Sequence, residues 1–319
     1  MENRVFVTGA SGQIGLPLVR ALVARGDAVT VLARGEKQAA ALQEAGAGVV
    51  RGDVEADDAL TAGVAGASVV FHLAGGLRGA GAWSADRLNR GGTEHLLAAV
   101  RRAGGTPPVV VLASSCAVYG DRSGLWIPED YPPSPATDYG RSKVAAESLV
   151  LGNGIRGRVA RIAAVYGPGC RFTMAESIAA GRAWLPGEGK NYVPIVHLED
   201  AVDALLAIAD RGADGEIYNV AAPACPLFRD FYAAVHRRVG GKPVRFWSTW
   251  IPSAIQFRLA AANEHLATRI NKKPRFTADA LRLATASARL KTLRLERELG
   301  FVWRYADFER GLDAFLPGA

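Results

Sequence analysis

The stretch RVFVTGASGQIGLPLVRALVARG (residues 4–26) joins an apolar run, a glycine-rich turn and a helix-like segment. Its first residues are rich in β-branched and aromatic types, which favours a short buried strand. Gly9, Gly12 and Gly15 follow at GxxGxxG spacing, and apolar residues from Ile14 onward recur at helical spacing. A strand that enters a helix through such glycines lets the backbone approach a pyrophosphate at the helix N-terminus. The stretch predicts the first unit of a dinucleotide-binding α/β domain.

Strand-like and helix-like segments alternate after this unit. We expect strands at 28–33, 48–53, 68–75, 108–115 and 157–167, and helices at 36–46, 56–66, about 84–103 and from about 138. The strand segments are nearly continuous apolar runs, which is typical of strands buried on both faces of a parallel sheet. The predicted fold is therefore α/β, with a doubly wound parallel sheet of the Rossmann type.

The alternation fades after Gly167, and segments 195–210 and 216–221 return to the sheet. We therefore expect two parts with interleaved boundaries. They are a dinucleotide-binding Rossmann domain (residues 1–168 plus 194–222) and a smaller, mostly helical substrate-binding domain (residues 169–193 plus 223–319).

Composition limits the class of protein. The 319 residues are 49% hydrophobic and 22% charged, which is ordinary for a globular protein with a sizeable core. The net charge of +7 is scattered, with its densest part in the C-terminal quarter. We interpret it as a solvated surface that suits an anionic small molecule, and we expect no nucleic-acid partner.

The sequence also bears on compartment and metals. The start lacks a signal-peptide pattern, and no run approaches the roughly 20 apolar residues that span a bilayer. Cys116, Cys170 and Cys225 lie far apart without a CxxC pair, which favours a reducing compartment. The five histidines show no paired spacing. We expect a cytoplasmic protein with no membrane span and no metal.

Several motifs occur together in a fixed order. A tyrosine and a lysine four positions apart, as in YGRSK (139–143), share one helix face by chance in many helices. Here they accompany the glycine turn and further segments: RGDV (51–54), HLAG (72–75), NRGGTEHLL (89–97), SSCAVYG (114–120), RIAAVYGPG (161–169) and VHLEDAVDALL (196–206). From residue 4 to about 221 this order resembles the extended short-chain dehydrogenase/reductase superfamily, in its NAD-dependent epimerase/dehydratase branch.

The resemblance implies catalytic roles. Tyr139 would be the general acid/base, Lys143 its helper and a partner of the nicotinamide ribose, and Asn89 a structural and proton-relay residue. Ser115 would hold the substrate oxygen, with Ser114 as its nearest rival. A phenol with a pKa of ~10 is a poor base at neutral pH. A nearby ammonium and the charge of an oxidised nicotinamide are expected to lower that pKa.

The resemblance also implies contacts to the cofactor. The glycine turn would cradle the pyrophosphate, RGDV would meet adenine, HLAG would pass under the adenosine ribose and pyrophosphate, and RIAAVYGPG would lie beneath the nicotinamide. The implied cofactor-binding residues are Gly9, Ser11, Gly12, Gln13, Ile14, Arg34, Asp53, Val54, Leu73, Ala74, Gly75, Tyr139, Lys143 and Val165.

The end of the second strand bears on which dinucleotide binds. An acidic residue there would bond the ribose 2′-OH and favour NAD. The chain has Ala33 instead, followed by Arg34 and nearby Lys37. A guanidinium can grip a 2′-phosphate, so NADP is expected to be preferred, and NAD stays open.

The substrate class depends on YVPIVH (192–197) and the C-terminal region. Nucleotide-sugar enzymes of the family place a phosphate-pairing arginine where this chain has Val193, although Arg171, Arg182 or Arg282 could replace it. The C-terminal region resembles the hydroxysteroid dehydrogenase and dihydroflavonol reductase side of the superfamily. Apolar residues there could line a pocket or only fill a core, and Trp83 could join the pocket mouth. The C-terminal candidates are Trp247, Trp250, Ile251 and Phe257.

These features predict an NAD(P)-dependent oxidoreductase that moves a hydride between nicotinamide and a secondary alcohol or ketone of a medium-sized, largely apolar substrate. One alternative is a nucleotide-sugar epimerase, dehydratase or ketoreductase with a retained NAD. Another is a catalytically inactive, dinucleotide-binding regulatory protein. The resemblance further implies a homodimer built from the helices at about 84–103 and 138–153.

Overall fold

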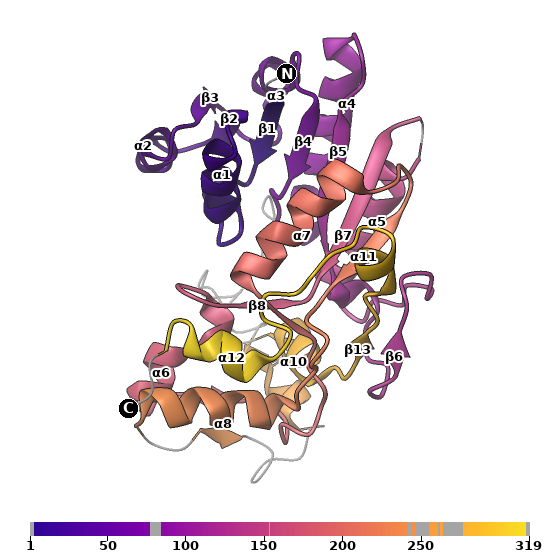
Figure 1. Ribbon diagram of the computed structural model, residues 1–319. Coiled ribbons are helices and arrows are strands. Elements are labelled where there is room, and N and C mark those ends of the chain that lie inside the picture. The colour runs from indigo at the N-terminus through magenta and orange to yellow at the C-terminus, as the bar shows by residue number, and fades with distance from the viewer. Residues whose placement is uncertain are drawn as a thin grey trace.

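A seven-stranded parallel sheet organises the computed structural model, which describes residues 3–76, 84–152, 154–241, 244–246, 255–260, 262–263 and 277–316 (Figure 1). The strand order is β11-β7-β5-β4-β1-β2-β3. The chain therefore winds in one direction from β1 through β3 and in the other from β4 onward. Ligands of such sheets bind at the carboxyl ends of the strands, at the switch between β1 and β4. The strands are β1 (Arg4–Thr8), β2 (Ala28–Ala33), β3 (Gly48–Arg51), β4 (Val69–His72), β5 (Val109–Ser115), β7 (Arg156–Ile162) and β11 (Ile217–Val220).

Helices cover both faces of this sheet, as the continuous apolar strands predict. Val5 and Val7 of β1 belong to one core cluster, which α1, α2 and α7 complete, and Phe6 belongs to the other, with α3, α4 and α5. The helices are α1 (Gly15–Ala24), α2 (Glu36–Glu44), α3 (Asp57–Val64), α4 (Gly92–Ala103), α5 (Asp138–Val150) and α7 (Leu198–Arg211). The predicted doubly wound α/β fold is confirmed.

The expected strand at 157–167 is two strands in two sheets. β7 ends at Ile162, and β8 (Ala164–Tyr166) pairs with β10 (Ile195–His197). The backbone N–H of Ala163 still donates to Val220 of the main sheet, whereas that of Ala164 donates to Pro194. The chain therefore leaves the main sheet at this peptide, although its apolar pattern continues without a break.

A third core cluster lies at one end of the sheet (Figure 1). Tyr166, Ile178, Phe231 and Leu312 are fully buried in it. We call this cluster and the elements around it the smaller lobe. Those elements are α6 (Ala175–Ala179), α8 (Phe228–Val239), α10 (Ala278–Thr285), α12 (Phe308–Asp313) and the strand pair β9 (Trp184–Leu185) with β12 (Arg245–Phe246). This separate core agrees with the expectation of a Rossmann domain and a smaller second domain. The residue boundaries between the two domains stay a prediction.

Two short elements close the edge beside β11. β6 (Trp126–Ile127) pairs with β13 (Arg289–Leu290), and α11 (Leu293–Arg297) packs against β11. Within the described ranges, no helix has both the length and the apolar character needed to cross a bilayer.

Candidate active site

The glycine turn after β1 is fixed by two close approaches. Gly9 has a φ of +71°, and a Cβ there would lie 2.5 Å from the backbone nitrogen of Ala74. A Cβ on Gly15 would lie 2.2 Å from the carbonyl oxygen of Gly9. Side chains are therefore excluded where the turn meets the loop after β4 and the start of α1. The first turn of α1 carries no acidic residue that would oppose an anion. This cradle fits a dinucleotide pyrophosphate.

A cavity of about 1110 Å³ runs from this turn into the smaller lobe. It brings together residues from segments that are distant in sequence, as expected from parallel strands with a common carboxyl edge. Ten of the predicted site residues line it: Gly9, Gly12, Gln13, Ile14, Leu73, Gly75, Ser115, Tyr139, Lys143 and Val165.

The other predicted site residues are not among those that line the cavity: Ser11, Arg34, Asp53, Val54, Ala74 and Asn89. Arg34, 57% exposed, lies 3.4 Å from the Asp53 carboxylate at the ends of β2 and β3. Val54 is buried in the core cluster of α3 and α4. The backbone N–H of Ala74 donates to the hydroxyl of Thr8, which holds the loop after β4 against β1.

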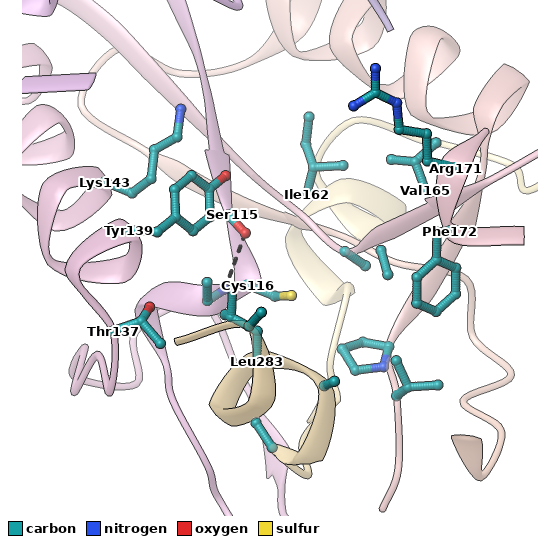
Figure 2. Close-up of a pocket in the computed structure, with 18 of the residues that line it drawn as sticks. Ser115, Cys116, Thr137, Tyr139, Lys143, Ile162, Val165, Arg171, Phe172 and Leu283 are labelled. Atoms are coloured by element: carbon teal, nitrogen blue, oxygen red, sulfur yellow. Dashed lines mark hydrogen bonds between the residues drawn. The ribbon is translucent and has the colours of Figure 1, made fainter. Parts of the chain in front are cut away.

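The start of α5 positions the tyrosine and the lysine. Thr137 caps this helix by accepting a hydrogen bond from the N–H of Gly140 at 3.1 Å. Tyr139 and Lys143 then follow one turn apart on the side that faces Ser115 (Figure 2). The ammonium of Lys143 donates to the Ala113 carbonyl at 2.8 Å and lies 6.0 Å from the Tyr139 ring centroid.

Burial moves the pKa values of these two groups away from their charged forms. It raises the pKa of Tyr139 to about 12, against the lowering effect of a hydrogen bond with Ser115. It lowers the pKa of Lys143 to about 8, against the effect of the Glu147 carboxylate. Desolvation therefore outweighs any lowering of the Tyr139 pKa by Lys143, whose ammonium is bonded to Ala113 instead, and the lowering by an oxidised nicotinamide stays a prediction.

The structure distinguishes the two adjacent serines. The hydroxyl of Ser114 donates to Glu147, which forms a buried ion pair with Arg161 at 2.7 Å. Ser114 thus belongs to a network inside the protein. Ser115 caps the short helical turn η3 (Cys116–Val118) by accepting a hydrogen bond from the N–H of Ala117 at 3.2 Å, and it lines the cavity, as Ser114 also does.

Asn89 connects the loop after β4 to helix α5. It lies in a π-helical turn, η2 (Arg87–Gly91), and is almost fully buried. Its amide nitrogen donates to the carbonyl of Gly76 at 3.0 Å and to Ser142 at 2.9 Å, and its oxygen accepts from the N–H of Gly76. These bonds fix the loop after β4 to α5. The proton-relay role stays a prediction.

The far half of the cavity was largely missed by sequence reasoning. Apolar side chains from four separate segments line it: Phe172, Met174, Leu185, Val193, Leu281 and Leu283. No Asp or Glu side chain lines the described cavity, and its cations are Lys143, Arg171 and Arg282. Cys116 also faces it, with a pKa raised to about 11 by burial, so the thiol stays neutral. No local pattern gathers these residues.

Within the described residues, none of the apolar and aromatic side chains predicted to line the substrate pocket is placed in the cavity. Trp83, Trp247, Trp250 and Ile251 lie outside the described residues. Phe257 lies 5.7 Å from the guanidinium of Arg282 and is not among the cavity residues. In the described part of the chain, no group of three or more His, Cys, Asp or Glu residues could hold a metal ion.

Comparison with known proteins assigns the sequence to a family. The model of the family described as "NAD dependent epimerase/dehydratase family" matches residues 5–221, which span the glycine turn through β11. The chain belongs to the NAD-dependent epimerase/dehydratase family. The resemblance inferred from the motif order is confirmed.

Relatives within and around this family are reductases and sugar-nucleotide proteins. A 4-hydroxy-2-methyl-3-oxo-4-farnesyl-3,4-dihydroquinoline-1-oxide ketoreductase of Stigmatella aurantiaca is 34% identical, over 98% of this chain and 95% of its own length. A 2-alkyl-3-oxoalkanoate reductase of Stenotrophomonas maltophilia is 32% identical, over 66% of this chain and 67% of its own. The solved structure of MoeE5 with UDP-glucose and NAD is 25% identical, with a TM-score of 0.75, over 98% of this chain and 97% of that one.

These matches establish the general activity. A family of nicotinamide-dependent enzymes, a reductase relative along nearly the whole chain and a cavity with a pyrophosphate cradle agree with one another. The protein is an oxidoreductase of the epimerase/dehydratase family.

Proposed function

We propose that this protein is an NADP-preferring ketoreductase that interconverts a ketone and a secondary alcohol on a medium-sized, largely apolar substrate. The observation that carries this proposal is the apolar far half of the cavity, which Val193 helps to line. The family resemblance implies that nucleotide-sugar enzymes have a phosphate-pairing arginine where this chain has Val193. A pocket with few polar groups favours an apolar ligand fixed by one polar contact. The ketoreductase of Stigmatella aurantiaca, whose named substrate carries a farnesyl group, supports the same class.

The reaction needs few groups of this chain. When bound, the nicotinamide dinucleotide supplies or accepts the hydride. In reduction, the Tyr139 hydroxyl donates its proton to the substrate oxygen, and a pKa of about 12 keeps that proton in place at neutral pH. Ser115 binds the same oxygen and fixes its direction. Lys143 would hold a ribose hydroxyl of the cofactor, and Asn89 keeps the adjoining loop in place through its bonds to Gly76.

The cofactor would lie along the glycine turn and the loop after β4, with Val165 beneath the nicotinamide. At its adenosine end, Arg34 would bind the 2′-phosphate of NADP. The 57% exposure of the Arg34 side chain at the end of β2 supports this role, because the guanidinium is accessible to a phosphate there. Asp53 and Val54 stay candidates for the adenine side.

We infer that the protein is a cytoplasmic homodimer. Cys116, Cys170 and Cys225 are all free thiols, which suits a reducing compartment. α4 and α5 pack against each other on one face of the sheet, which is where the family resemblance implies a partner copy.

A ligand screen tests the substrate class. With NADPH present, apolar ketones such as steroid, flavonoid and polyketide-like compounds should raise the Tm, and UDP- and dTDP-sugars should not. A ligand at 100 times its Kd adds about 2.7 kcal/mol of stability, which corresponds to a rise in Tm of about 4 °C for a chain of this size. A shift confined to nucleotide sugars would contradict the proposed class.

A second candidate is a nucleotide-sugar epimerase or dehydratase with a retained NAD. The likeness to MoeE5 with UDP-glucose and NAD favours it, as do Arg171 and Arg282 in the cavity lining. NAD that stays bound through purification would support it. An inactive regulatory protein is the third candidate, and it predicts dinucleotide binding without turnover of any ketone.

A further inference from the structure

Arg171 presents an unused cation at the cavity wall. It begins the short turn η4 (Arg171–Thr173), just after β8, and its side chain is exposed. Within the described ranges, its guanidinium has no hydrogen bond and no ion pair. Arg282, the other cavity arginine, is paired with Asp279 at 3.1 Å. Arg171 therefore keeps its charge available for an anion inside the cavity.

The position of Arg171 links it to the glycine turn. Its backbone N–H donates to the side-chain oxygen of Gln13 at 3.2 Å, and both residues line the same cavity. Gln13 lies between Gly12 and Gly15, where α1 begins. This contact joins the turn to the segment that leads into the smaller lobe. Figure 2 shows Arg171 across the cavity from Lys143 and Tyr139.

The glycine turn leaves part of an anion's charge uncompensated. Backbone N–H groups and a helix N-terminus supply partial positive charge to a pyrophosphate, equivalent to about half a unit charge. A dinucleotide pyrophosphate carries two negative charges. No carboxylate lines the described cavity to compete for a cation there. The backbone of Arg171 bonds to the turn residue Gln13, and a guanidinium on the same cavity wall suits the remaining charge, with two N–H groups for two phosphate oxygens.

We propose that Arg171 binds the pyrophosphate of the nicotinamide dinucleotide from the side opposite to the glycine turn. The segment after β8 that carries Arg171, which we call the clamp, thereby holds the cofactor between the sheet and the smaller lobe. The hydrogen bond from the Arg171 backbone to Gln13 fixes the position of this segment relative to the glycine turn. This inference rests on the proposed function, because it requires a dinucleotide in the cavity. It assigns to the cofactor an arginine that could otherwise meet a substrate phosphate.

Titrations with three ligands test the assignment: NADPH, ADP-ribose and AMP. ADP-ribose contains the pyrophosphate without nicotinamide, and AMP has one phosphate. Arg171→Ala should weaken NADPH and ADP-ribose about 10- to 100-fold and AMP less than about threefold, as expected for loss of a charged hydrogen-bonding partner. Arg171→Lys should recover part of the loss, since a point charge remains. Arg282→Ala, the matched cavity variant, should leave all three affinities within about twofold of the wild type.

The outcomes separate the two proposals. Wild-type affinity for NADPH and ADP-ribose in a folded Arg171→Ala variant, checked by an unchanged Tm, overturns the clamp while the proposed function stands. Loss of UDP-glucose binding in that variant with intact NADPH binding also overturns it, because Arg171 would then serve a substrate phosphate. A wild-type protein that binds neither NADPH nor ADP-ribose refutes the proposed function, and the clamp with it.

Discussion

Burial shifts the pKa values of Tyr139 and Lys143 in opposite directions, since each shift favours the uncharged form. The shift of Lys143 can be tested through the stability of the protein. Its pKa of about 8 lies below its ordinary 10.5, so the folded protein holds this proton less tightly than the unfolded chain. Below pH 8 the buried ammonium destabilises the fold, and the penalty disappears as the pH rises from 8 to 10.5. The shift corresponds to about 3 kcal/mol, reduced by the bond to Ala113 that a substitution would lose.

Lys143→Met should therefore be more stable than the wild type at pH 7, and the gain should shrink between pH 8 and 10.5. Urea unfolding at several pH values measures it. Lys190→Met, at an exposed lysine that pairs with Glu188, serves as the control and should show no such gain. A gain for Lys143→Met that is independent of pH would contradict the shifted pKa.

The sequence alone does not show which of the two adjacent serines, Ser114 or Ser115, faces the substrate. Ser114 and Ser115 are equivalent in the motif, and only the partner of Ser114, Glu147 on α5, separates them. We expect Ser115→Ala to lower kcat about 100-fold or more with an unchanged Tm. Ser114→Ala leaves a buried carboxylate oxygen without that donor, so it should lower the Tm and largely preserve kcat. The reverse pattern would reassign the catalytic serine.

At the scale of elements, helices and strands of the sheet were predictable because each carries its own periodicity. The expected strand at 28–33 matches β2, and the helix expected from about 138 begins at Asp138. The wall formed by α10 was not predictable. Its place depends on distant partners, since Asn191 donates to the carbonyls of Ala284 and Ala286, and Asp279 accepts from the N–H of Asp138. No local pattern encodes such contacts.

The ends of β2 and β3 determine the dinucleotide preference in this account. NADPH should bind more tightly than NADH, and Arg34→Ala should narrow the gap by about tenfold, because it removes the cation that faces the 2′-phosphate. Fluorescence titration with both cofactors measures this. Arg101→Ala, an exposed arginine of α4, is the control. Equal affinities in the wild type would remove the NADP preference.

The distribution of exposed apolar side chains over the molecule bears on the predicted homodimer. The apolar residues that α4 carries on several faces are used within its own chain, since Leu96, Leu97 and Val100 are buried against α3 and α5. In the described ranges, large exposed apolar side chains lie on other elements: Leu125, Trp126, Ile255, Leu259, Leu293 and Val302. An interface on α4 and α5 would therefore be more polar than the sequence pattern indicated.

Sedimentation at micromolar concentration should nevertheless show the predicted homodimer. Ser148 is exposed on α5, and Ser148→Arg would place like charges across a twofold axis and should shift the protein toward monomers. Val302→Arg, on a site 85% exposed outside these helices, should not. A monomeric wild type would refute the dimer.

The most direct test of the account is turnover by the Tyr139→Phe variant. The wild type should oxidise NADPH in the presence of an apolar ketone that raises its Tm. Tyr139→Phe should lower kcat about 100- to 10,000-fold and keep the NADPH Kd within about twofold, because only proton transfer is removed. Tyr305→Phe, a tyrosine outside the cavity that bonds Glu199, should keep wild-type kcat. Full activity in Tyr139→Phe would contradict the proposed reaction centre.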